Sequence, residues 1–213
     1  MAIFESIFDI GYLTTVMIIS LLIIRKGNRK DMVLFGVMGL LLGIGDAFHL
    51  IPRILGHLTT GLDDYQSYLG FGKLVTSISM TLFYVLLYLF YEERLGENKK
   101  VMKLIYSLVF IRFALLALPG NNWVANDSTL FYGILRNIPF AMIGVIIVME
   151  FYKSKEKLFV NIAHWIVVSF VCYTIVVLGA GFIPVLGAFM MPKTIAYLII
   201  IILGFKNLNL KYK

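Results

Sequence analysis

The sequence contains few residues of the types that build redox and metal sites. Its one cysteine, Cys172, lies inside an apolar segment, and the chain has no second cysteine with which it could form a disulfide. The three histidines, His49, His57 and His164, show neither an H-x-x-x-H nor an H-E-x-x-H spacing. We therefore predict no metal site and no cofactor.

Charged residues are also scarce, and no polar stretch is long enough for a soluble domain. Only 15% of the residues are charged, 60% are hydrophobic, and the mean hydropathy is +0.90. This composition is typical of integral membrane proteins. The net charge of +7 resides mainly in short links, so we predict no nucleic-acid partner.

Long apolar segments make up most of the chain. A helix needs about 20 apolar residues to cross the hydrocarbon core of a bilayer. Seven segments have or approach that length: 3–24, 33–54, 69–91, 103–119, 129–152, 158–182 and 186–205. We predict an all-α integral membrane protein in which residues 1–213 form a single seven-helix transmembrane bundle.

The basic residues indicate the orientation of this bundle. Fourteen of the nineteen Lys and Arg residues lie in four short stretches, which follow the first, third, fifth and seventh segments. The alternate links, 55–68 and 120–128, contain no Lys or Arg but do contain Asp63, Asp64 and Asp127. Lys and Arg concentrate in cytoplasmic loops. We therefore predict a multi-pass protein of the cell membrane, with the N-terminus outside and the C-terminus in the cytoplasm.

Five basic residues remain outside these stretches, each in or at the edge of a different segment. They are Arg53, Lys73, Arg112, Arg136 and Lys193. All five fall in the half predicted to face outward, where a cation costs several kcal/mol unless it is paired or hydrated. The acids of that half are Glu5, Asp9 and Asp46, which leaves a surplus of two cations. We predict an outward-open, water-filled pocket that binds an anionic ligand.

The two deepest of these cations are arginines, which favour oxyanions. A guanidinium group matches a phosphate or carboxylate in bidentate fashion. Arg112 lies nine residues past Lys103, about 13 Å along the helix, and is far from both membrane surfaces. Arg112, Arg136 and the adjacent Asn137 are the first candidates for anion ligands. The alternative is that both arginines pair with acids of other helices, Asp46 and Asp9.

Other polar side chains of the outer half complete the predicted binding set. Lys73 and Ser77 share a face of the third segment, and Lys193 and Tyr197 share a face of the seventh. Arg53 and Asp9 are included, although Asp9 is also suited to a structural ion pair. We predict that these side chains line the pocket together with the two arginines.

The end of the second segment carries the candidates for catalysis. Asp46, His49 and Arg53 are three and then four residues apart, so they share one helix face. A carboxylate one turn from an imidazole orients the imidazole and raises its pKa, which suits the imidazole for general acid–base catalysis. Asp46 and His49 are therefore the catalytic candidates. The equal alternative is that Asp46 pairs with Arg53 or another cation and His49 lies at the wet rim. A nucleophile set of Ser77, His49 and Asp46 competes with a Ser77 hydroxyl bonded to its own helix backbone.

The same stretch carries a local resemblance to a known family. Gly45-Asp46, followed by Pro52 in an otherwise apolar helix, resembles a segment of the lysoplasmalogenases, integral membrane enzymes that cleave the vinyl ether of lysoplasmalogens. The resemblance covers eight residues of 213, and a further acidic motif of that family is not found here. It implies a lipid substrate, with Asp46 as the acid.

All five prolines lie in the outer half. Pro52, Pro119 and Pro184 are expected near helix ends, where proline ends a helix. Pro139 and Pro192 are expected inside helices, where protein or water must satisfy the freed carbonyl group.

Three classes of function compete. The first is a membrane-embedded lipid hydrolase or lipid-binding protein, whose partners would be membrane lipids or another small amphiphile with an anionic head. The second is a small-solute transporter with a 3+1+3 helix arrangement, and the third is a seven-helix sensor. Residues 33–42 and 198–203 of the inner half contain no ionisable side chain, and this one-sided polarity favours the first class. Gly39 and Gly43 permit close helix packing, either within the bundle or in a homo-oligomer.

Overall fold

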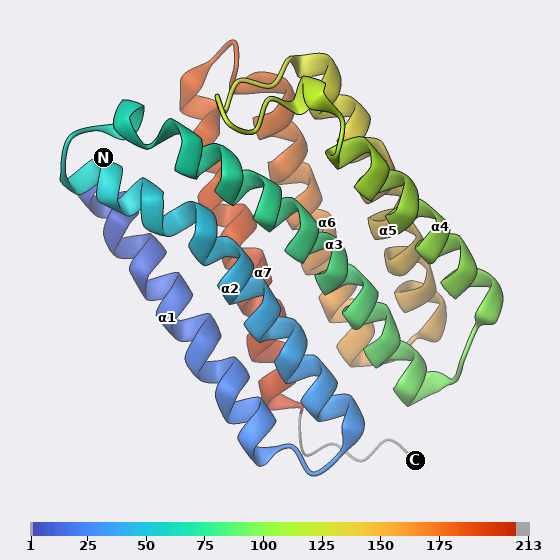
Figure 1. Cartoon of the computed structure of the whole chain (residues 1–213). Coiled ribbons are helices and arrows are strands. Elements are labelled where there is room, and N and C mark those ends of the chain that lie inside the picture. Colours follow the sequence, from blue (N-terminus) through green and yellow to red (C-terminus); the bar gives the residue numbers. More distant parts are fainter. Residues whose placement is uncertain (1, 208–213) are drawn as a thin grey trace.

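The computed structural model describes residues 2–207, which form an α-helical bundle (Figure 1). The described chain contains seven α-helices and three short 3-10 helices, in this order: α1 Ala2–Lys26, α2 Lys30–Leu58, η1 Leu62–Tyr65, α3 Gln66–Leu95, α4 Lys99–Leu116, η2 Pro119–Asn121, α5 Leu130–Ser154, α6 Lys157–Gly179, η3 Pro184–Phe189 and α7 Met190–Lys206. The all-α prediction is confirmed. Lys211 and Lys213, which contributed to the predicted orientation, lie outside the described residues.

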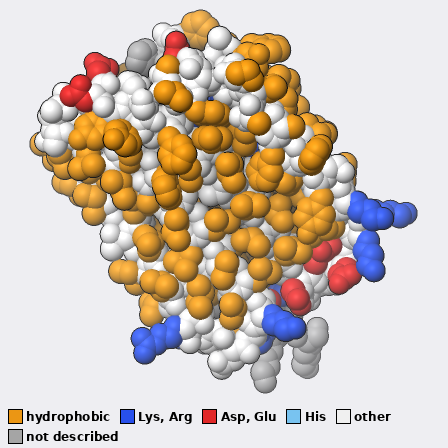
Figure 2. All heavy atoms as spheres, in the orientation of Figure 1, with side chains coloured by type: hydrophobic (Ala, Val, Ile, Leu, Met, Phe, Trp, Pro, Cys, Tyr) orange, Lys and Arg blue, Asp and Glu red, His pale blue; other side chains and the backbone are white. Residues whose placement is uncertain are grey.

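Six of the seven helices in residues 2–207 are long and apolar enough to cross a membrane. The exception is α4, whose 18 residues include four basic ones, Lys99, Lys100, Lys103 and Arg112. Figure 2 shows hydrophobic side chains over the middle of the visible face, with Lys and Arg toward its lower end. An apolar outer surface is what contact with lipid requires. The chain is therefore a multi-pass helical membrane protein, and the seven-span prediction is supported for six helices.

Six helices form a closed ring. The packed pairs are α1 with α2, α2 with α3, α3 with α5, α5 with α6, α6 with α7, and α7 with α1. The remaining helix, α4, lies outside the ring against α5 and α3. Figure 1 shows that α1, α3, α5 and α7 all finish at the same end of the bundle, which we call the basic end because the Lys- and Arg-rich links lie there. The opposite end, where α1 begins, is called the N-terminal end.

The second helix does not end where its proline predicts. It continues six residues past Pro52, so the prediction that Pro52 ends this helix is wrong. Proline has no amide hydrogen, which leaves the carbonyl group of Phe48 without its usual helical donor. Here α3 crosses α2 so closely that a Cβ on Gly72 would overlap the Phe48 carbonyl oxygen. Pro139 lies inside α5 as expected, whereas Pro192 lies in the first turn of α7, where no amide donor is needed.

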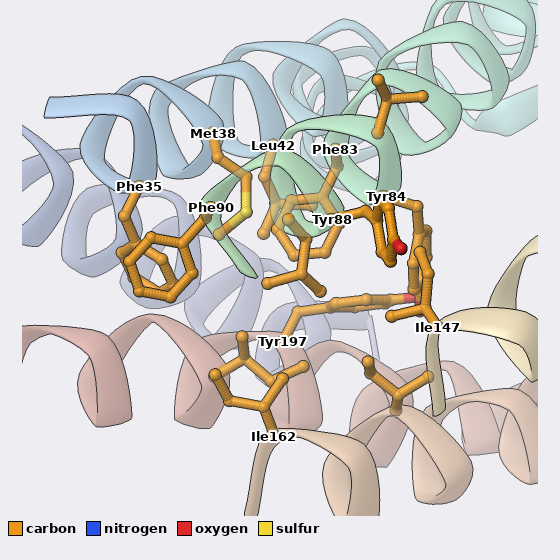
Figure 3. Close-up of a cluster of buried hydrophobic side chains, with 14 of the residues drawn as sticks. Phe35, Met38, Leu42, Phe83, Tyr84, Tyr88, Phe90, Ile147, Ile162 and Tyr197 are labelled. Atoms are coloured by element: carbon orange, nitrogen blue, oxygen red, sulfur yellow. The ribbon is translucent and has the colours of Figure 1, made fainter. Parts of the chain in front are cut away.

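Large buried side chains fill the centre of the ring (Figure 3). The hydroxyl groups of Tyr84 on α3 and Tyr197 on α7 are 3.2 Å apart, and the ring of Phe83 packs edge-on against Tyr197. Further side chains buried in this cluster include Phe35, Met38, Leu42, Tyr88, Phe90, Ile147 and Ile162. Close packing of this kind holds membrane helices together, because lipid provides little hydrophobic driving force for their association.

A buried ion pair joins α2 and α3 at the basic end. Asp31 accepts hydrogen bonds from Arg29 at 2.6 Å and from Arg94 at 2.7 Å. The Arg94 side chain is only 3% exposed, and its guanidinium group lies over the ring of Phe90. Arg94 is therefore a buried arginine whose charge is balanced by a carboxylate.

Candidate functional site

A cavity of about 260 Å³ lies inside the ring, near the N-terminal end. Four basic side chains line it, each from a different helix: Lys73 from α3, Arg112 from α4, Arg136 from α5 and Lys193 from α7. No Asp or Glu among the described residues is part of this lining. We call it the cationic cavity.

The close crossing of α2 and α3 brings His49 to the cavity wall beside Lys73. A Cβ on Gly72 would also overlap the backbone of His49, so only a residue without a side chain fits between the two helices. One ring nitrogen of His49, Nδ1, lies 3.3 Å from the carbonyl oxygen of Leu69. This contact joins the two helices and fixes the orientation of the imidazole at the edge of the cavity.

Arg112 is the most deeply buried of the four cations, with 2% of its surface exposed. One of its terminal nitrogens donates to the carbonyl oxygen of Arg136 at 2.9 Å and to Oδ1 of Asn137 at 3.4 Å. The guanidinium carbon lies 4.1 Å from the ring centroid of Phe140. Its Nε is buried and has no hydrogen-bond partner among residues 2–207. The partners found are uncharged, so the alternative in which Arg112 pairs with Asp46 or Asp9 is wrong.

Arg136 is held by the link between α4 and α5. It donates a 2.8 Å hydrogen bond to Oδ1 of Asn121, and its guanidinium carbon lies 4.6 Å from the ring centroid of Trp123. The amide group of Asn121, which is 1% exposed, also donates to three carbonyl oxygens: those of Leu115 and Leu116 at the end of α4, and that of Leu118 just after it. The link thus folds inward and orients Arg136 with neutral groups, which excludes an ion pair with Asp46 or Asp9.

The two lysines approach the cavity from opposite helices of the ring. Lys193 Nζ lies 4.7 Å from the ring centroid of Tyr173, whose hydroxyl donates to Oδ1 of Asn137 at 3.2 Å. Asn137 lies outside the cavity lining, and its Oδ1 holds both Arg112 and Tyr173. Neither Lys73 nor Lys193 forms an ion pair within the described part of the chain.

The fifth cation, Arg53, lies elsewhere. It forms an ion pair with Glu5, because α1 runs beside the end of α2 and brings the two side chains together. Asp9 is also buried on α1, close enough to Arg53 for their charges to interact. Arg53, Asp9 and Tyr197 are all outside the lining of the cationic cavity. The predicted convergence of five cations on one pocket is therefore wrong for Arg53, whose charge a neighbouring helix balances.

The structure separates the two catalytic candidates. The hydroxyl of Tyr12, from α1, donates to Asp46 at 2.7 Å, while His49 contacts Leu69; no hydrogen bond joins Asp46 to His49 within residues 2–207. Only His49 of the two lines the cavity. The ion pair of Arg53 with Glu5 also excludes the alternative in which Asp46 pairs with Arg53.

The proposed nucleophile set is not assembled either. The hydroxyl of Ser77 lies in the cavity lining but donates at 2.7 Å to the carbonyl oxygen of Lys73, one turn earlier in its own helix. This is the usual behaviour of hydroxyl side chains in apolar helices. The catalytic roles of Asp46 and His49 stay predictions.

Sequence reasoning missed the neutral residues that hold the cations. Asn121 and Trp123 lie in a link without Lys or Arg, and that absence directs attention to topology and away from a site. Phe140 and Tyr173 belong to apolar segments rich in aromatic residues, so their type alone carries no signal. Of these residues, Trp123 was the easiest to predict from the sequence, because an aromatic residue near a membrane arginine suggests a cation–π contact. Its indole also donates a hydrogen bond to the Leu116 carbonyl oxygen.

The side chains that line the cationic cavity are suited to an anion. No group of three or more His, Cys, Asp or Glu side chains suited to a metal occurs among residues 2–207. Guanidinium and ammonium donors around one hollow are the groups that recognise phosphate and carboxylate oxygens.

Comparison of this chain with protein-family models, curated proteins and solved structures finds no match. The resemblance of Gly45, Asp46 and Pro52 to lysoplasmalogenases is therefore confined to a short stretch of α2 and supports no family assignment.

Proposed function

We propose that this protein binds an amphiphile with an anionic head, and that the phosphate or carboxylate of the head occupies the cationic cavity. The observation that carries the proposal is the charge imbalance of the cavity. Four basic side chains line it, no described acid does, and the groups that contact the two arginines are neutral. Asp46, which lies close enough to Lys193 for their charges to interact, offsets one of the four charges at most.

An anionic ligand is the simplest source of the missing negative charge. A cation without a counter-charge inside a membrane costs several kcal/mol, and hydrogen bonds to neutral carbonyls offset only part of that cost. Each charge-assisted hydrogen bond to a ligand oxygen contributes about 1.5–3 kcal/mol. The ammonium groups of Lys73 and Lys193, which form no ion pair within residues 2–207, line the cavity and provide donors for such bonds.

The distribution of basic residues favours one orientation of this site in the membrane. With the basic end in the cytoplasm, as the excess of Lys and Arg favours, the cavity opens in the outward half of the bundle. In this arrangement α4 is the seventh span, lying against α3 and α5 with Arg112 turned away from lipid. The head of the ligand would then come from the outer leaflet of the cell membrane or from outside.

Binding is favoured over transport by the core beneath the cavity. Buried aromatic side chains, among them Phe83, Tyr84 and Tyr197, fill the ring between the cavity and the basic end (Figure 3). A transporter needs a polar path that continues to the other side. Binding is favoured over hydrolysis because Asp46 and His49 contact different partners.

Thermal unfolding in a neutral maltoside detergent tests the proposal. Dodecyl phosphate at about 100 times its Kd should stabilise the purified protein by about 2.7 kcal/mol, a Tm increase of about 5–11 °C for a chain of this size. The same concentration of additional dodecyl maltoside should produce no comparable shift. Equal stabilisation by the charged and uncharged amphiphiles would contradict the proposal.

Two cavity variants and one control identify the site. Arg136→Gln and Lys193→Gln should each reduce the dodecyl phosphate shift to about half or less, as expected for the loss of one charge-assisted contact. Lys100→Gln removes an exposed charge at the basic end and should leave the shift unchanged. If both cavity variants respond like Lys100→Gln, the anion does not bind in the cavity.

A further inference from the structure

An apolar groove between α5 and α6 lies on the other side of one wall of the cationic cavity. A small hollow of about 150 Å³ shares three lining residues with the cavity, Phe140, Tyr173 and Val177. Because these side chains border both spaces, a single layer of residues separates the groove from the cavity. The head site is therefore adjacent to the outer surface of the bundle at this seam.

The groove continues along the same pair of helices toward the basic end. A larger hollow of about 500 Å³ shares Ala141, Phe170 and Thr174 with the small one. It reaches Ile166 on α6, eleven residues from Val177, which corresponds to about 17 Å along the helix. One leaflet accounts for about half of a 30 Å hydrocarbon core. The two hollows, which we call the α5–α6 groove, thus span roughly one leaflet.

The walls of the groove suit a hydrocarbon chain. Neither hollow has a charged residue in its lining. Gly144 of α5 creates room, since a Cβ there would overlap the ring of Phe170, which packs in this space. Residues farther along the groove, such as Val145 and Val171, are about half exposed on the outer surface, where lipid would lie.

We propose that the α5–α6 groove holds the acyl or alkyl chain of a single membrane amphiphile whose anionic head occupies the cationic cavity. This inference rests on the proposed function and adds the place where the hydrocarbon chain of the amphiphile lies. Charge complementarity supports the position of the head, and the wall shared by the cavity and the groove supports the direction of the tail. Bulk lipid alone would contact every outer helix face without preference for this seam.

Photolabelling in nanodiscs of neutral phosphatidylcholine tests the tail position. The probe is dodecyl phosphate with a diazirine near the end of its chain, and mass spectrometry maps the labelled residues. We expect labelling that concentrates on α5 and α6 between residues 141 and 175 and is lost on addition of unlabelled dodecyl phosphate, but not of dodecyl maltoside. Competed labelling that concentrates on other helices would overturn the groove while retaining the head site. Labelling that is uniform and not competed would overturn both.

A substitution that fills the α5–α6 groove provides the second test. Ala141 is an exposed residue at the junction of the two hollows, and Ala141→Phe should abolish the competed labelling of the groove. Ala114→Phe makes the same change at an exposed position of α4 outside the hollows and should leave the labelling unchanged. If Ala141→Phe retains the competed labelling on residues 141–175, the chain does not lie in the groove.

Discussion

Arg112 and Arg94 are two buried arginines in opposite electrostatic situations, and the same substitution should affect them in opposite ways. Arg112 is 2% exposed as a whole residue, the side chain of Arg94 is 3% exposed, and both guanidinium groups lie over a phenylalanine ring. Arg94 pairs with the carboxylate of Asp31, whereas Arg112 contacts a carbonyl and an amide oxygen. Arg94→Met and Arg112→Met therefore form a matched pair.

The expected change in stability of each variant follows from the groups that its arginine contacts in the structure. Removing one member of a buried ion pair costs about 3–5 kcal/mol, which lowers the Tm of a chain of this size by about 6–20 °C. Arg94→Met should lie near the lower limit, because Asp31 keeps Arg29 as a partner. Arg112→Met loses hydrogen bonds of about 1.5–3 kcal/mol but removes a buried charge that costs several kcal/mol. We expect the ligand-free Tm of Arg112→Met to equal or exceed that of the wild type.

The affinity for dodecyl phosphate should change in Arg112→Met and not in Arg94→Met, the reverse of the expected effect on stability. Arg112→Met should raise the Kd for dodecyl phosphate about 10–150-fold, the equivalent of one charge-assisted contact, whereas Arg94→Met should bind it normally when folded. Titration of the Tm shift in a maltoside detergent measures both quantities. A ligand-free Tm that falls as far in Arg112→Met as in Arg94→Met would refute the reasoning, since Arg112 would then serve the fold as an ordinary paired cation does.

Two further substitutions test the assignment of neighbouring groups. Glu5→Gln should lower the Tm by about 3–12 °C, because the partly exposed Arg53 loses a charge-assisted contact of about 1.5–3 kcal/mol. It should not change the dodecyl phosphate shift, and a weakened shift would show that Arg53 belongs to the binding site. Asn121→Ala should lower the free energy of unfolding by about 1–3 kcal/mol, because it leaves carbonyl oxygens unsatisfied. It should also weaken dodecyl phosphate binding, because Arg136 loses the acceptor that orients it. Unchanged binding with reduced stability would limit Asn121 to the fold.

The helical architecture was predictable from local sequence alone. In lipid every backbone donor and acceptor must be satisfied within the segment, so a run of about 20 apolar residues has almost no alternative to a helix. The predicted segments correspond to the seven helices, with differences at their ends. Near the end of α2, Pro52 was expected to stop the helix, but the helix continues to Leu58. At the same place Gly72 of α3 packs closely against the backbone of α2. Such a contact depends on another helix and is invisible in the local pattern.

The surplus of cations was also readable from the sequence, because charge adds along a chain regardless of how it folds. Lys73, Arg112, Arg136 and Lys193 were singled out by their position in apolar segments, and all four line one cavity. Their partners were not readable. Glu5 balances Arg53, and Tyr12 binds Asp46, through contacts between α1 and α2 that helix spacing within one segment does not determine.

Composition and charge order thus determined that this chain is a multi-pass helical protein with unbalanced positive charge in one half of its bundle. The tertiary structure alone decided which cations share a cavity, which neutral side chains hold them, and that an apolar groove between α5 and α6 begins at the cavity wall. The physical reason is the distance along the chain over which each effect acts. Hydropathy and helix formation act within about 20 residues of sequence, whereas the pairing of a charge and the shape of a cavity depend on atoms that only helix packing brings within a few ångströms of each other.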